Sequence, residues 1–226
     1  MKWAFLLWFM LCSPVYAAPV STIQASYQVF MSGMQVGEMV ETYSRTDDRY
    51  TLTSTTTPQG LMAIFKPGNI VAASQGLVDK NGLRPLHFEQ KKQGDASRDS
   101  HAEFDWDAQQ LTLTGQQLPL PEGTQDRLSA MYQFMFLTLE NVSSLDFPMT
   151  NGNKLDNYHY APGEHKKLTT PAGRFDTVYL DSQGKPGESR TEIWLDTRHH
   201  LPCKMIITDH RGDQITQILS RLKITP

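Results

Sequence analysis

Histidine, cysteine and carboxylate side chains are the usual protein ligands of transition metals, and the sequence holds seven histidines. His199 and His200 are adjacent, and neighbouring residues of a β-strand point to opposite faces, so both can bind one ion only at a local bend. No His-x-His or His-Glu-x-x-His spacing occurs, and Cys203 has only Cys12, near the N-terminus, as a second cysteine. The pattern favours solvated loop histidines, and we expect neither a metal site nor a cofactor.

Motifs of nucleophilic catalysis are missing from the sequence. It has no Gly-x-Ser-x-Gly, no paired cysteine and histidine, and no Ser-x-x-Lys at a helix start. Asp95, Ser97, Asp99 and His101 lie close together, but this spacing is typical of a charged hairpin end and not of a positioned triad. We therefore expect no enzyme, with paired carboxylates for glycoside hydrolysis left open because any two acidic residues can meet in a fold.

Methionine and aromatic side chains are the more informative feature. Methionine is flexible and polarisable, so it repacks around apolar molecules of different shape. The segment 60–68 holds consecutive apolar residues between two glycines, which predicts a short helical turn or loop that could cover a lipophilic cavity. Plain filling of a core is the alternative at each position. The residues predicted to contact an apolar ligand are Leu61, Met62, Ile64, Phe65, Met131 and Met135.

Residues 124–140 form the one long segment with a helical pattern. Thr124 can cap its first turn, and Asp126 places a negative charge where the helix dipole favours one. Aromatic residues widen the apolar surface nearly all round the helix. Its main apolar positions recur at spacings of three and four residues: Leu128, Met131, Met135 and Leu139.

Most of the remaining sequence alternates between apolar and polar residues, as β-strands do. Residues 23–31 put apolar side chains on one face, and residues 50–57 put four threonines on one face, which is typical of a strand facing solvent or a wet interior. Asn81-Gly82 predicts a tight hairpin turn. A mostly apolar helix among strands must be covered by them. The sequence thus predicts a mainly β fold, a curved antiparallel sheet or half-open β-barrel around one long α-helix, in a single domain over residues 18–226.

Residues 1–17 have the features of a secretory signal peptide. Lys2 precedes an apolar run that is too short to span a membrane, and we expect cleavage after Ala17. No later apolar stretch is long enough to span a bilayer. The formal charge is −3, and it falls to −4 when Lys2 is removed. With no large basic cluster, this charge argues against nucleic acid as a partner.

Several short motifs occur in an order that resembles the DUF3108 family of exported bacterial proteins. They are Asn81–Phe88, Phe104–Trp106, Gln125–Tyr132, Ile193–Asp196 and the Leu201-Pro202 pair that follows. The resemblance covers most of the chain after the leader and implies a periplasmic location in a Gram-negative bacterium. It carries no assigned activity and no catalytic residues. By a looser likeness of fold, the chain is similar to half-open barrels of the LolA and LolB type, which carry lipoproteins.

Two functions are compatible with these features. The first is a non-enzymatic periplasmic protein of the cell envelope that binds a lipid or another hydrophobic small molecule in a half-open barrel. The alternative is a structural or assembly factor of the envelope that has a fully packed core and acts through a protein partner, for instance by adding a strand to an edge.

Overall fold

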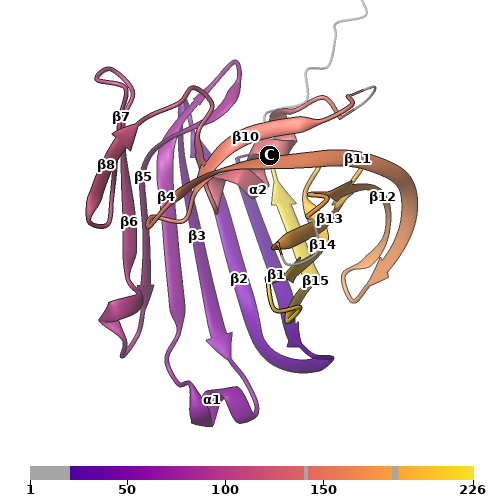
Figure 1. Ribbon diagram of the computed structural model, residues 1–226. Coiled ribbons are helices and arrows are strands. Elements are labelled where there is room, and N and C mark those ends of the chain that lie inside the picture. The colour runs from indigo at the N-terminus through magenta and orange to yellow at the C-terminus, as the bar shows by residue number, and fades with distance from the viewer. Residues whose placement is uncertain (1–20, 140–141, 185–187) are drawn as a thin grey trace, which may run out of the picture.

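The computed structural model describes residues 21–139, 142–184 and 188–226 of the protein (Figure 1). The predicted signal peptide 1–17 and its cleavage after Ala17 lie outside the described residues. Every described strand belongs to one sheet, in the order β8-β7-β6-β5-β4-β3-β2-β1-β15-β14-β13-β12-β11-β10-β9. Neighbouring strands are antiparallel, except that β9 runs parallel to β10. The expected mainly β, antiparallel fold is confirmed.

The strands along the first half of the chain are β1 Thr22–Met31, β2 Met34–Thr46, β3 Arg49–Pro58, β4 Ile70–Asp79, β5 Gly82–Lys92, β6 Ser100–Asp105, β7 Gln110–Leu113 and β8 Gln116–Pro119. Those along the second half are β9 Gln125–Asp126, β10 Leu145–Thr150, β11 Leu155–Thr170, β12 Gly173–Asp181, β13 Arg190–Asp196, β14 Pro202–Thr208 and β15 Gln214–Thr225. The described helices are short: α1 Leu61–Phe65, η1 Ala96–Arg98, α2 Ser129–Gln133 and η2 Phe134–Phe136.

Alternation in the sequence decides which face of each strand is buried. On β1, Ile23, Ala25, Tyr27 and Val29 all face inward and are buried. On β3, the inward residues are Tyr50, Leu52 and Ser54, whereas the threonines between them face outward. A polar face turned to water and an apolar face turned to the core is the usual arrangement of an antiparallel sheet with one wet side.

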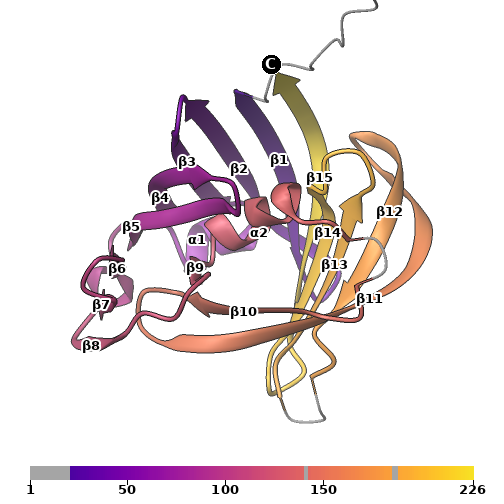
Figure 2. The same ribbon diagram turned by 90° about the horizontal axis from the view of Figure 1, so that it is seen from above.

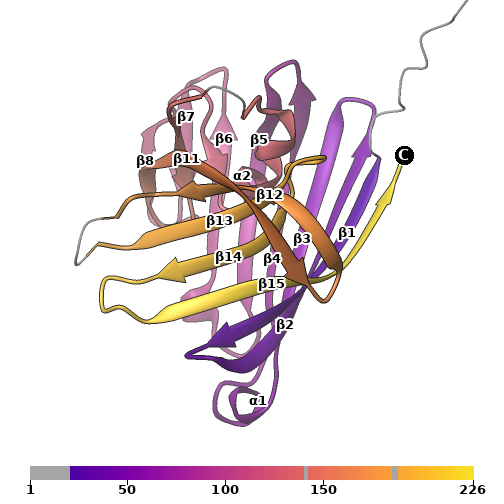
Figure 3. The ribbon, with the colours of Figure 1, turned by 90° about the vertical axis from the view of Figure 1, so that its right-hand side faces the viewer.

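The sheet curls so far that its two ends almost meet (Figure 2). Its edge strands β8 and β9 share no ladder, so the sheet is not closed. The turn between β10 and β11 spans the gap instead. The hydroxyl of Ser100 donates to the carbonyl of Asn151 at 2.9 Å, and the backbone N–H of Thr114 donates to that of Gly152 at 2.9 Å. Figure 3 shows β13–β15 crossing the side of the molecule at a steep angle to β1–β3.

The prediction of one long helix over residues 124–140 is wrong. Gln125 and Asp126 pair with β10 as a strand, and only five residues of α-helix and three of 3₁₀-helix follow. Leu137 is already extended, with φ −99° and ψ 142°. The apolar pattern is nevertheless obeyed, because both walls of the curl contact this segment. Such a pattern reports burial on all sides, and it does not fix how far the helical backbone continues.

Capping explains where α2 begins. The hydroxyl of Thr124 donates to the carbonyl of Pro121 at 2.7 Å, so Thr124 does not cap the helix as expected. Asp126 does so instead: its Oδ1 accepts the backbone N–H groups of Leu128 at 2.8 Å and Ser129 at 2.9 Å. The Ser129 hydroxyl in turn accepts the N–H of Asp126 at 3.0 Å. This reciprocal arrangement resembles a capping box and holds the first turn of α2 against the sheet.

The helix α2 lies inside the curl and joins two parts of the core (Figure 2). Leu128 and Tyr132 pack into the cluster under β1–β7, with the Tyr132 ring stacked on Tyr43 at 5.7 Å. Phe134 packs into the cluster under β10–β13, edge-on to Phe147 and Tyr160 at 6.0 Å. A third cluster, centred on Tyr27, Met39, Cys203 and Leu219, fills the bend between β2 and β14.

Candidate ligand-binding interior

Two buried glutamines fix α2 against a strand edge that no other strand covers. Gln133 accepts the backbone N–H of Leu83 at 2.7 Å and donates to the carbonyl of Asn81 at 2.8 Å. Gln125 donates to the carbonyl of Leu83 at 2.8 Å. Gly82, with φ +108°, lies directly under Gln133 and leaves no room for a Cβ atom. The turn at Asn81-Gly82 is therefore shaped to receive the helix as well as to reverse the chain.

A buried hydrogen-bond chain connects the start of α2 to β3 and β4. The Tyr50 and Ser74 hydroxyls lie 3.0 Å apart, and Ser74 donates to Oδ2 of Asp126 at 2.5 Å. Burial raises the pKa of Asp126, and hydrogen bonds from Ser74, Ser129 and Leu128 oppose that rise. All of the contacts of Asp126 belong to the fold, so we assign it a structural role.

Glu41 is a second buried carboxyl group, on the inward face of β2. It is 7% exposed, and the Tyr132 hydroxyl donates to its Oε2 at 3.1 Å. Burial raises the pKa of Glu41 to about 7, although hydrogen bonds from Tyr132 and Ser54 and the positive charge of Arg127 lower it in part. A carboxyl group that titrates near neutral pH inside a protein is a common sign of a functional site.

Arg127 carries the opposite charge in the same interior. Its side chain is exposed to water, yet burial lowers the pKa of its guanidinium, while Glu41, Asp126 and Tyr158 act electrostatically to raise it. The exposed side chain and the lowered pKa are compatible if the water that reaches Arg127 lies within the curl, between β2 and β11. Among the described residues, no side chain lies within hydrogen-bonding or ion-pairing distance of the guanidinium; only the backbone N–H has a partner, the carbonyl of Thr150 at 2.9 Å. We call Glu41 and Arg127 the inner charged pair.

The inner face of β14 and β15 is incompletely covered. Met205 packs against the cluster under β10–β13, and Ile215 packs against the cluster at the bend. Ile207 pairs with Ile215 and shares its face. All three side chains point inward and all three are only half-buried. Apolar residues that face an interior without filling it leave room for an apolar molecule.

A separate cavity of about 350 Å³ lies at the seam between β5 and β10. We call it the seam cavity, and its walls include Leu83, Arg84, Trp106, Gln125, Leu137 and Phe147. The Arg84 guanidinium stacks over the Trp106 ring at 4.9 Å. Arg84 Nε and Gln125 Oε1 are buried there without a hydrogen-bond partner. Both groups differ from Arg127. The Gln125 amide is neutral, and the positive charge of Arg84 is stabilised by the Trp106 ring.

The six residues predicted to bind an apolar ligand fall into two groups. Met131 and Met135 lie on and just after α2 and pack against the core. Leu61, Met62, Ile64 and Phe65 lie on α1, whose main contacts are with β2 and β3 and which occupies the opposite end of the sheet (Figure 1). Leu61, Ile64 and Phe65 are 65%, 72% and 75% exposed, and we call these three the α1 tip. The structure therefore does not bring the two groups together, and ligand contact stays a prediction for each.

The sequence carried a signal for Glu41 that the motif search did not use. Met39, Glu41 and Tyr43 occupy alternate positions of β2, so a carboxylate stands where the pattern requires an apolar residue. Arg127 gives no such signal in the sequence. It lies in the segment 124–140, where the pattern predicts a helix that is apolar nearly all round, and that pattern assigns no role to a single arginine.

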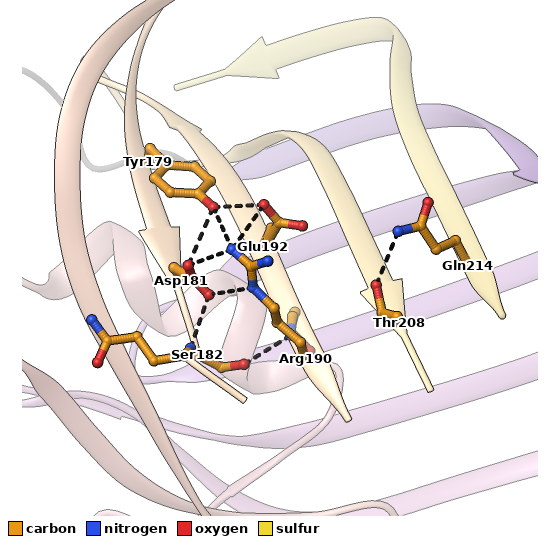
Figure 4. A network of polar contacts seen from close by, with 9 residues as sticks. Tyr179, Asp181, Ser182, Arg190, Glu192, Thr208 and Gln214 are labelled. Carbon is orange, nitrogen blue, oxygen red and sulfur yellow. Dashed lines mark hydrogen bonds and ion pairs between the residues drawn. The ribbon is translucent and has the colours of Figure 1, made fainter. Parts of the chain in front are cut away.

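A polar network on the outer face of β12 and β13 pairs an arginine with two carboxylates (Figure 4). Arg190 donates to both oxygens of Asp181, at 2.9 and 2.6 Å, and lies 3.4 Å from Glu192. The Tyr179 hydroxyl donates to Glu192 at 2.6 Å. The hydrogen bonds from Arg190 lower the pKa of Asp181. Arg127 has none of these contacts.

The adjacent histidines and the buried cysteine make separate contacts within the fold. His199 Nδ1 lies 3.3 Å from Asp196, whereas His200 adopts φ 54° and its Nδ1 lies 3.2 Å from the carbonyl of Phe134. Cys203 is buried, and burial raises its pKa to about 12. In the described ranges, no three or more His, Cys, Asp or Glu side chains are grouped to hold a metal ion. None of the described helices is long and apolar enough to cross a membrane.

The fold and its interior define a mainly β protein with one large sheet that curls around a short helix without closing. The model of the family described as "Protein of unknown function (DUF3108)" matches residues 26–219, so the chain belongs to this family, and the expected resemblance is confirmed. None of the curated proteins matches the chain.

Two bacterial proteins are among the solved structures that match this chain. One is described as a "putative lipoprotein" from Parabacteroides distasonis, with a TM-score of 0.39 and 11% identity over 91% of this chain and 96% of that chain. The other is described as a "putative exported protein with YmcC-like fold" from Bacteroides fragilis, with a TM-score of 0.33 and 11% identity over 89% of this chain and 95% of that chain.

Proposed function

We propose that this protein is an exported, non-enzymatic binding protein of the bacterial cell envelope, which holds a lipid or another apolar ligand inside its curled sheet. The observation that supports this most directly is the half-buried inner face formed by Met205, Ile207 and Ile215. A protein interior is normally packed without voids, so apolar groups that face inward and stay partly uncovered call for a further apolar partner. Export itself rests on the predicted leader and on the family.

The first test is native mass spectrometry of protein recovered from the periplasm, compared with its denatured mass. We expect extra mass that disappears on denaturation, and a mature chain that begins at Ala18. The second test is binding of the neutral hydrophobic dye Nile red to protein stripped of ligand. A bare native chain that also fails to bind Nile red would contradict the proposal.

Two neighbouring residues of β14 provide a matched pair of variants. Ile207 faces inward and Ile206 faces outward, and both are half-buried. Replacing Ile207 by Glu places a charge in the proposed site, so Nile red affinity should fall at least tenfold. Ile206→Glu makes the same change on the outer face and should leave the affinity unchanged. Equal losses in both variants, with both chains folded by circular dichroism, would show that the dye does not bind inside.

A second candidate function is favoured by the α1 tip. Three large apolar side chains that project into solvent together are unusual in a protein that acts alone. We propose, as the alternative, an envelope assembly factor whose α1 tip inserts into an apolar groove of a protein partner. A photo-crosslinker at Phe65 should then trap one partner in cells, whereas the same group at Thr53, exposed on the outer face of β3, should not. Crosslinking at neither position would argue against this function.

A further inference from the structure

The interior contains one positive charge for which the described chain supplies no contact. Taking a charged side chain out of bulk water is costly unless another charge or hydrogen-bonding group replaces the water. The Arg127 side chain is exposed to water but lies among Glu41, Asp126 and Tyr158, and burial by the surrounding chain lowers the pKa of its guanidinium. Arg190, on the outer face, makes a bidentate contact with Asp181, and the described residues give Arg127 no such contact.

Neither carboxyl group near Arg127 replaces that missing partner. Asp126 directs both oxygens to Ser74 and to the first turn of α2. Glu41 faces Arg127 across the interior and is hydrogen-bonded to Tyr132. Since the pKa of Glu41 is about 7, its negative charge is only partly present at neutral pH. The interior therefore has a place for one more anionic group.

The apolar surroundings of Arg127 connect it to the half-buried inner face. Tyr158, one of its electrostatic neighbours, borders the cluster under β10–β13, and Met205 borders the same cluster. Met39, two residues from Glu41 on the same face of β2, belongs to the cluster at the bend, which Ile215 borders. An amphiphile that bridges these groups would have its charged end at Arg127 and its apolar part along β14 and β15.

We infer that the ligand of the proposed binding site is an amphiphile with a single acidic head group, a carboxylate or a phosphate monoester, which binds the Arg127 guanidinium while its acyl or alkyl chain lies on Met205, Ile207 and Ile215. This inference rests on the proposed function and gives the same site its chemical specificity. A planar guanidinium suits such a group, because its N–H donors match the two oxygens of a carboxylate or a phosphate.

The test compares three twelve-carbon compounds with the same chain: dodecanoate, dodecyl phosphate and 1-dodecanol. Each displaces Nile red from the full mature protein at pH 7.5, below the concentration at which it forms micelles. We expect an acidic compound to bind at least tenfold more tightly than the alcohol, and the stronger of the two acids identifies the head group. Equal binding of all three would overturn the inference but leave the proposed function standing. Failure of the dye and all three compounds to bind would overturn the proposed function itself.

Variants locate the charge that selects the head group. Arg127→Gln should abolish the preference for the acid and leave the affinity for 1-dodecanol unchanged, whereas Arg127→Lys should keep part of the preference. Arg84→Gln removes the guanidinium of the seam cavity and serves as the matched control. If Arg127→Gln keeps the preference, or if only Arg84→Gln loses it, the inference is wrong. Binding of the alcohol by each variant shows that the chain is folded.

The inner charged pair predicts that the preference for the acidic compound over the alcohol depends on pH. A purely structural arginine would not produce this dependence. At pH 8 an ionised Glu41 repels an anionic head group, and at pH 6 this repulsion is largely absent. The preference of the native protein for the acid should therefore grow by several-fold from pH 8 to pH 6. In Glu41→Gln it should be high at both values. A preference that responds to pH equally in both proteins would contradict the placement of the head group.

Discussion

Replacing Glu41 by Gln should change how the stability of this protein depends on pH. The pKa of Glu41 rises from 4.5 to about 7 in the folded protein because the carboxyl group is buried. The folded state therefore holds a proton that the unfolded state releases between these two values, and unfolding becomes easier as pH rises through this range. At about 1.4 kcal/mol for each unit, the raised pKa costs the native protein about 3 kcal/mol above pH 7.

The glutamine side chain is nearly isosteric with the protonated acid, and its oxygen can still accept the hydrogen bond from Tyr132. We expect Glu41→Gln to match the native protein near pH 4.5 and to exceed its free energy of unfolding by up to about 3 kcal/mol at pH 8. Urea denaturation followed by the fluorescence of Trp106 and Trp194 measures this difference. Asp126 contributes a slope of the same sign to both proteins, so the difference between them is the quantity to follow.

The matched control is Glu38→Gln, because Glu38 is exposed on the outer face of the same strand. It should change the free energy of unfolding by less than about 0.5 kcal/mol at every pH. A difference between Glu41→Gln and the native protein that stays constant from pH 4.5 to 8 would refute the reasoning, since the effect would then not come from ionisation.

Three further predictions concern the turn at Gly82, the helix α2 and the α1 tip. Gly82→Ala should lower the free energy of unfolding by roughly 2–4 kcal/mol, because φ is +108° and the new Cβ would meet the side chain of Gln133; Gly123→Ala, at φ +74° with open space around it, should cost about 1 kcal/mol by the same urea assay. Leu128→Ala should cost roughly 2–5 kcal/mol, since the side chain is 5% exposed within the core, and an unchanged thermal midpoint would contradict the packing of α2. Phe65→Ser should shift the thermal midpoint by less than about 2 °C, because the ring is 75% exposed, and a large loss would show that the α1 tip belongs to the core.

Alternation along the sequence was enough to predict the sheet. The inward positions of β1 are apolar at every second residue, and the threonine face of β3 is turned to water, because the side chains of a strand alternate strictly between its two faces. The order of a few short motifs was likewise enough for the DUF3108 family, whose model covers residues 26–219.

The length of the helix α2 could not be predicted from the hydrophobic pattern. Leu128, Tyr132, Phe134 and Leu139 are buried, and Met131 and Met135 are partly buried. The helical backbone nevertheless ends at Phe136, and Gln125 and Asp126 form β9. The hydrogen bonds of Asp126 set the start of α2, and contacts with both walls of the curl surround its length. Hydrophobic periodicity cannot distinguish a long helix from a short one enclosed on two sides, since both bury the same residues.

The sequence by itself determined that this protein is mainly strand and which face of strands such as β1 and β3 is apolar, because those properties depend on neighbours along the chain. Only the tertiary structure placed Glu41 and Arg127 in one interior and separated the α1 tip from Met131 and Met135 by the length of the sheet. Those relations depend on how far the sheet curls and on where the turn between β10 and β11 meets β6. They arise from contacts between residues far apart in the chain, which no local pattern records.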